Sequence, residues 1–169
     1  MLLLALTLAC VPDDVDQTGT TDTAESGDTA DTATSANGFV GTWLSEGEDL
    51  SPLFAGDPFH YTRIDAVFHR DGTYEVVGVD TQGASYDFAG TYLLDDSTTP
   101  GTITQTQTVP YDATAEGLWL VDDDLLTFEI VQTSPDYGYT PATPEGGFGS
   151  TAGPGLEDGD NVQTYVRVP

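Results

Sequence analysis

From Gly38 onward the chain consists of short runs of β-branched and aromatic residues that end at glycine, proline or aspartate. Such runs are typical of strands, because branched and aromatic side chains pack well on a pleated surface. No stretch carries apolar residues at a sustained period of 3.6, so amphipathic helices are not indicated. We therefore expect strands near 39–45, 61–69, 73–80, 85–94, 102–109, 117–121, 125–132 and 162–168.

The connections between most of these strands are short. Turn residues stand at 70–72, 82–83 and 122–124, which predicts hairpins and hence an antiparallel sheet. An antiparallel sheet must protect its edges, so the pattern favours an up-and-down barrel or a sandwich. We predict an all-β fold, a small antiparallel up-and-down barrel of about eight strands, since eight strands enclose side chains or one small ligand.

Three short motifs give the region 38–169 a resemblance to the lipocalins and their bacterial relatives. Gly41-Thr42-Trp43 resembles the Gly-x-Trp signature of that family, and Phe68-His-Arg-Asp-Gly-Thr-Tyr74 and Gly90-Thr-Tyr-Leu-Leu94 follow it as in lipocalin-like domains. The resemblance implies that Trp43 closes one end of the barrel beneath an arginine near the end of the chain. Arg167 stands in the place of that arginine.

The segment 1–10 is an apolar run that ends at Cys10, the only cysteine. It is too short for a membrane span, which takes about 20 apolar residues, but it suits a signal peptide. Leu8-Ala9-Cys10 resembles the end of a lipoprotein signal, which implies cleavage before Cys10 and its acylation. We expect an exported protein, anchored to the bacterial cell envelope and more specifically to the outer membrane; the alternative is a buried or stray thiol.

Residues 11–37 consist mostly of Asp, Thr, Ala, Gly and Ser, a composition that cannot form a core. We predict a disordered tether between the anchor and the domain. A calcium loop is the alternative, because six residues match the spacing of an EF-hand-type loop. These are Asp14, Asp16, Thr18, Gly19, Asp22 and Glu25.

The charge is strongly one-sided, with 29 Asp and Glu against Arg63, Arg70 and Arg167 and no lysine. Nucleic acids and anionic lipids are polyanions that require Lys and Arg, so both are excluded as surface partners. We expect a solvated acidic surface and a monomer attached to the membrane only through its lipid. A cation-binding acidic surface is the alternative.

The connection 134–161 is long and rich in Gly, Pro and Tyr. Loops of this length in a compact domain are functional or disordered. Two interpretations therefore stay open. One is a flap over the barrel mouth that uses Tyr137, Tyr139 and Phe148, and the other is a surface excursion.

Motifs for chemistry are missing from the sequence. His60 and His69 are too far apart for a metal-binding pair, and no nucleophile elbow, Cys/His pair, phosphate loop or dinucleotide fingerprint occurs. We predict a protein that is not an enzyme and has no catalytic residue, metal or cofactor.

Strand alternation identifies candidate lumen residues. If the face with Ile103 and Val109 points inward, Gln105 and Gln107 do so too. Neighbouring strands would add aromatic residues to the same interior, namely Tyr86, Phe88, Tyr92 and Phe128. The function expected is binding of a small apolar or amphipathic molecule. The alternative is a structural or interaction lipoprotein whose barrel is filled by its own side chains.

The anchor prediction can be tested in cells. Replacing Cys10 with serine (Cys10→Ser) should abolish fatty-acid labelling and release the protein from the membrane fraction, because an acidic chain has no affinity of its own for anionic lipid. A variant that remains labelled and membrane-bound contradicts acylation at this residue.

Overall fold

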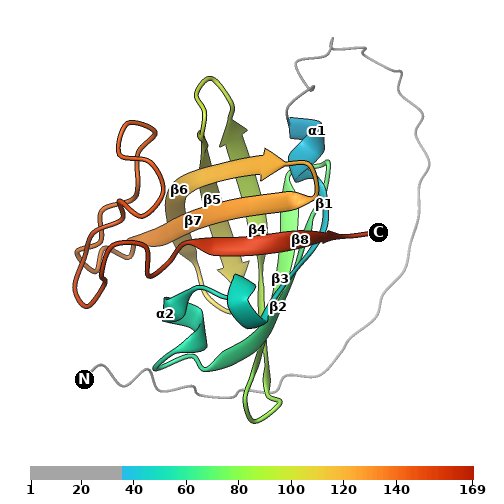
Figure 1. Ribbon diagram of the computed structural model, residues 1–169, viewed down its shortest axis with the longest axis vertical. Helices are drawn as coiled ribbons and strands as arrows, with labels where there is room; N and C mark the ends of the chain where they lie inside the picture. The colour runs from blue at the N-terminus through green and yellow to red at the C-terminus, as the bar shows by residue number, and fades with distance from the viewer. Residues whose placement is uncertain (1–35) are drawn as a thin grey trace, which may run out of the picture. The chain divides into compact units, whose positions relative to one another are not determined.

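The computed structural model describes residues 36–169 and confirms an all-β, up-and-down barrel of eight antiparallel strands (Figure 1). Each strand pairs with its neighbours in sequence, and β8 pairs with β1 to close the barrel. The strands are β1 (Gly41–Glu46), β2 (Tyr61–Phe68), β3 (Thr73–Asp80), β4 (Ser85–Asp95), β5 (Gly101–Val109), β6 (Ala113–Asp122), β7 (Leu125–Ser134) and β8 (Gln163–Val168). Three one-turn helices accompany them: α1 (Ala36–Phe39), η1 (Gly47–Asp49) and α2 (Pro52–Ala55).

The observed strand bounds match the expected ones to within two residues, except at the start of β6. Phe39 was expected in the first strand but ends α1, and β6 begins at Ala113 rather than near Gly117. Helix α1 also starts inside the segment that we assigned to the tether. The signal segment with Cys10, most of the tether and the calcium-loop pattern lie outside the described residues.

The up-and-down order divides the connections between two ends of the barrel. We call one the sealed end; it holds α1, the connections 69–72, 96–100 and 123–124, and the chain terminus at Pro169. The other, the open end, holds the connections 47–60, 81–84, 110–112 and 135–162. In Figure 1 α2 and the long loop lie on one side of the barrel, and α1 and the C-terminus lie on the other.

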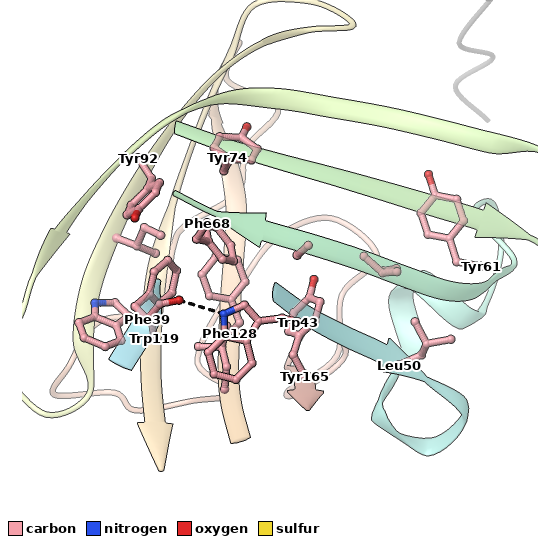
Figure 2. Packing of buried hydrophobic residues seen from close by; sticks show 14 residues of the cluster. Phe39, Trp43, Leu50, Tyr61, Phe68, Tyr74, Tyr92, Trp119, Phe128 and Tyr165 are labelled. Carbon is pink, nitrogen blue, oxygen red and sulfur yellow. Dashed lines mark hydrogen bonds between the residues drawn. The ribbon is translucent and has the colours of Figure 1, made fainter. Parts of the chain in front are cut away.

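An aromatic cluster fills the sealed end. Phe39 is completely buried, and its ring centroid lies 4.3 Å from that of Phe68 and 5.3 Å from that of Trp119. Figure 2 shows these rings close to Phe128, while Tyr61 lies apart from them toward the open end. Burial of one such side chain stabilises the fold by about 1.5–3 kcal/mol. This gain favours a position for Phe39 inside the barrel over a place in the first strand.

Arg167 closes the sealed end over Trp43. The guanidinium carbon lies 4.1 Å from the centre of the indole, a cation–π contact worth about 0.5–2 kcal/mol. The guanidinium also donates hydrogen bonds to the carbonyls of Val40, at 3.1 Å, and Gly38. The indole Nε1 donates to the Phe39 carbonyl at 2.9 Å. The contact implied by the lipocalin resemblance is therefore present, and it holds α1 in place.

Glycine is required at position 41 for two reasons. Its φ of +150° is strongly disfavoured for residues with a side chain, and a Cβ there would lie 2.5 Å from Nη1 of Arg167. Both defined positions of the Gly-x-Trp motif therefore serve Arg167. Trp43 provides the indole on which the guanidinium stacks, and Gly41 leaves the space that the guanidinium needs.

Replacing this glycine with alanine (Gly41→Ala) should lower the free energy of unfolding by at least about 2 kcal/mol, because strain and displacement of Arg167 add together. Chemical denaturation measures the loss. The control is Gly47→Ala, also at positive φ but with no atom within 4 Å of the new Cβ. Equal losses in the two variants would mean that the close approach to Arg167 contributes nothing.

An apolar cavity as the candidate functional site

A cavity of about 340 Å³ lies inside the barrel and reaches its open end. Phe68, Tyr74 and Phe128, which also belong to the buried core, line its inner part. Residues of the open-end connections line its mouth: Leu53, Phe54, Phe59, Tyr111, Tyr137, Tyr139 and Leu156. No Asp, Glu, Lys, Arg or His lines the cavity in the described part of the chain.

Four of the six predicted lumen residues line this cavity: Gln105, Gln107, Phe88 and Phe128. The alternation assigned to β5 is therefore correct from Ile103, which is buried, to Gln107. It fails at Val109, which is 43 % exposed, because the pairing of β4 with β5 shifts register between Ala89 and Gly90. This irregularity displaces the end of β5 from the regular inward and outward pattern.

The other two predicted lumen residues, Tyr86 and Tyr92, do not line this cavity. Tyr86 is exposed near the β3–β4 hairpin, where its hydroxyl donates to Asp80 at 3.1 Å. Tyr92 points inward but lies in the sealed-end cluster, where its hydroxyl donates to the His69 carbonyl at 2.6 Å. Both residues lie on the predicted strand, and their pairing partners Gly78 and Gln105 do line the cavity.

Side-chain amides of five residues line the cavity beside its tyrosines. Gln107 donates from Nε2 to the Tyr111 carbonyl at 3.0 Å, Gln132 to the Pro135 carbonyl at 3.2 Å, and Asn161 to the Ile130 carbonyl at 3.1 Å. Gln105 is 6 % exposed, and its amide makes no hydrogen bond within residues 36–169. Because no fully enclosed side-chain N or O of this region lacks a partner, the Gln105 amide must face the cavity space.

Helix α2 brings Phe54 to the mouth and is fixed by a buried polar group. Ser51 caps the helix by accepting from the Phe54 N–H, and Pro52 at the first helical position suits the start of a helix. Gln163 accepts from the Ser51 N–H at 2.9 Å and donates to the Ser45 hydroxyl, so β8 and β1 both hold the helix. This arrangement could not be predicted, since its partners are 112 and 118 residues apart.

The long loop is folded onto the barrel through Glu129. This residue is completely buried on the outer face of β7, and its carboxylate accepts from the N–H groups of Gly149, at 2.6 Å, and Thr151, at 3.0 Å. A bridge between Thr140 and Ala152 adds two backbone hydrogen bonds within the loop. The loop is therefore a packed part of the domain rather than a loose excursion.

The loop also contributes to the cavity mouth, as the flap interpretation expected. Tyr137 and Tyr139 line the cavity, whereas Phe148 is half-buried elsewhere and does not. Leu53 on α2 donates its N–H to the Asp160 carbonyl at 2.9 Å, so the helix and the loop meet at the open end.

Sequence reasoning missed Glu129, because alternation along β7 placed it on a face expected to meet solvent.

Three phenols that line the cavity, those of Tyr61, Tyr74 and Tyr165, remain neutral at ordinary pH. Burial raises the pKa of Tyr74 to about 12, and burial with the nearby Tyr86 and Asp80 raises the pKa of Tyr61 to about 12. Burial also raises the pKa of Tyr165. These hydroxyls can therefore donate or accept hydrogen bonds but add no charge.

The described residues contain no group of three or more His, Cys, Asp or Glu side chains that could hold a metal ion. His60 Nε2 lies 2.7 Å from the Asp57 carboxylate at the open end, while His69 stands in the β2–β3 turn at the other end. No helix within 36–169 is long and apolar enough to cross a membrane.

The fold and the cavity define a closed eight-stranded barrel with an uncharged, largely aromatic interior that opens at one end. No protein-family model matches the chain, and neither a curated protein nor a solved structure does.

Replacing Glu129 with glutamine (Glu129→Gln) should destabilise the loop by about 1–3 kcal/mol, because an amide NH₂ would then face a backbone N–H and leave it unpaired. Limited proteolysis between residues 135 and 162 should become faster. Glu116→Gln on neighbouring β6 is the control, since it removes the same charge from a less buried position. Equal protease resistance of all three proteins would contradict the role of Glu129.

Proposed function

We propose that this chain is a lipid-anchored protein of the cell envelope whose barrel binds a small apolar or amphipathic molecule. The observation that carries the proposal is the cavity, whose volume of about 340 Å³ falls in the usual range for small-molecule sites. Its aromatic lining offers apolar contact, and its few amides offer hydrogen bonds that orient a ligand. Attachment through acylated Cys10 is the second part of the proposal and rests on the signal-like sequence.

A structural or interaction protein with a self-filled barrel is the second candidate. The aromatic cluster at the sealed end favours it, because that half of the barrel is filled by Phe39 and its neighbours. The cavity favours binding. Side chains fill the sealed end, and the space for a ligand lies toward the open end. For either function we propose a non-enzymatic protein, in keeping with the absence of catalytic motifs from the sequence.

Binding can be measured with N-phenyl-1-naphthylamine, an uncharged dye that becomes fluorescent in apolar surroundings. One dye molecule should bind per barrel, and 1-dodecanol should displace it. If the domain keeps its β-sheet circular dichroism but takes up neither molecule, the proposal of a binding protein is wrong.

The double change Gln105→Leu and Gln107→Leu should weaken 1-dodecanol binding about tenfold, because two hydrogen bonds to its hydroxyl would be lost at about 0.5–1.5 kcal/mol each. The fold should be unchanged, since Gln105 bonds no residue within 36–169 and the exposed Tyr111 carbonyl can bond water once Gln107 is gone. Gln82→Leu in the exposed β3–β4 turn is the matched control. Undiminished affinity in the double variant would show that the two glutamines do not orient the ligand.

A further inference from the structure

We infer that the cavity selects uncharged amphiphiles whose head group donates hydrogen bonds, and that it rejects otherwise identical anions. This inference rests on the proposed binding function and adds the chemical class of the ligand. Three independent features of the described residues support it: the lining, the mouth and the free acceptors of the amides.

The lining offers no oppositely charged partner for an anion. Arg63 is bound to Asp65 on the outside of β2, at 2.6–2.7 Å, while Arg70 lies in the β2–β3 turn and Arg167 covers Trp43 at the sealed end. No arginine is therefore available inside the cavity. An anionic head group that entered would lose its hydration without gaining an opposite charge, and burial of an unpaired ion costs several kcal/mol.

The negatively charged mouth of the cavity repels an anion as well. The four open-end connections contain no Lys or Arg, and their only histidine, His60, is bound to Asp57. They contain nine carboxylates, namely Glu48, Asp49, Asp57, Asp112, Asp136, Glu145, Glu157, Asp158 and Asp160. Asp112 and Asp136 each adjoin a tyrosine that lines the mouth. Their charges therefore act on an entering ligand within the screening length, roughly 8–10 Å at physiological ionic strength.

The amides indicate the head group that is accepted. Gln107, Gln132 and Asn161 each donate their NH₂ group to a backbone carbonyl, which can only accept, so the orientation of these amides is fixed. Their carbonyl oxygens receive no hydrogen bond from any residue within 36–169. These three oxygens are hydrogen-bond acceptors, which a hydroxyl or N–H group satisfies and a carboxylate does not.

The experiment uses two pairs of probes that differ in charge. N-phenyl-1-naphthylamine and 1-anilinonaphthalene-8-sulfonate share one ring system, and 1-dodecanol and dodecanoate share one chain. At pH 8 the uncharged member of each pair should bind at least about thirtyfold more tightly, a modest share of the cost of burying an unpaired anion. Sulfonate fluorescence counts only where 1-dodecanol displaces it, which restricts the signal to the cavity.

The contribution of the mouth is separated by two variants of equal net charge. The pair Asp112→Asn and Asp136→Asn removes two charges beside the cavity, and the pair Asp96→Asn and Asp122→Asn removes two exposed charges at the sealed end. The first pair should reduce the preference for the uncharged dye at least about threefold, whereas the second should leave it unchanged because of ionic screening. Equal effects of the two pairs would overturn the role of the mouth.

The possible failures are distinguishable. If the anions bind as tightly as their uncharged partners, the charge selection is wrong but the binding function stands. If neither the uncharged dye nor 1-dodecanol binds, the proposed function itself fails. If the uncharged probes bind and the anions do not, the inferred ligand class is supported.

Discussion

The seam between the first and last strands is the contact on which the rest of the barrel depends. Only three residue pairs join β1 to β8, from Thr42 with Val168 to Leu44 with Val166, and Arg167 pairs with Trp43 at the centre of this ladder. The guanidinium stacked on the indole strengthens the seam and also binds the carbonyls of Gly38 and Val40. One side chain thus closes the sheet, which removes its edges, and fixes the segment that carries Phe39.

The position of Phe39 then determines where a ligand can bind. Its ring contacts Phe68, Tyr92 and Trp119, so the sealed half of the barrel is filled before any ligand arrives. At the open end, α2 and the long loop are held by Gln163 and Glu129 rather than by apolar contacts alone. The cavity therefore lies between an aromatic floor and a mouth that buried hydrogen bonds hold in place.

The sequence predicted the faces of the strands better than the depth of their residues. Alternation with a period of two correctly placed Phe88, Gln105 and Phe128, because it follows from strand geometry alone. It could not place Tyr86 and Tyr92, since depth along the barrel depends on the stagger between strands. Phe39 and Glu129 were missed for a related reason. Their burial is caused by segments distant in the chain, and local composition contains no signal for such contacts.

The strong acidity of the chain and the neutrality of its cavity have one structural origin. Strand alternation separates the two faces of the barrel wall, so carboxylates gather outside while the residues that line the cavity stay uncharged. Glu129 is completely buried on the outer face, and both its oxygens accept backbone N–H groups. A negative charge is thus accommodated in this protein where N–H donors surround it. The cavity has no cation in its lining, and three of its amides direct their oxygens rather than their N–H groups to a ligand, so the same physical rule that permits Glu129 disfavours an anionic ligand there.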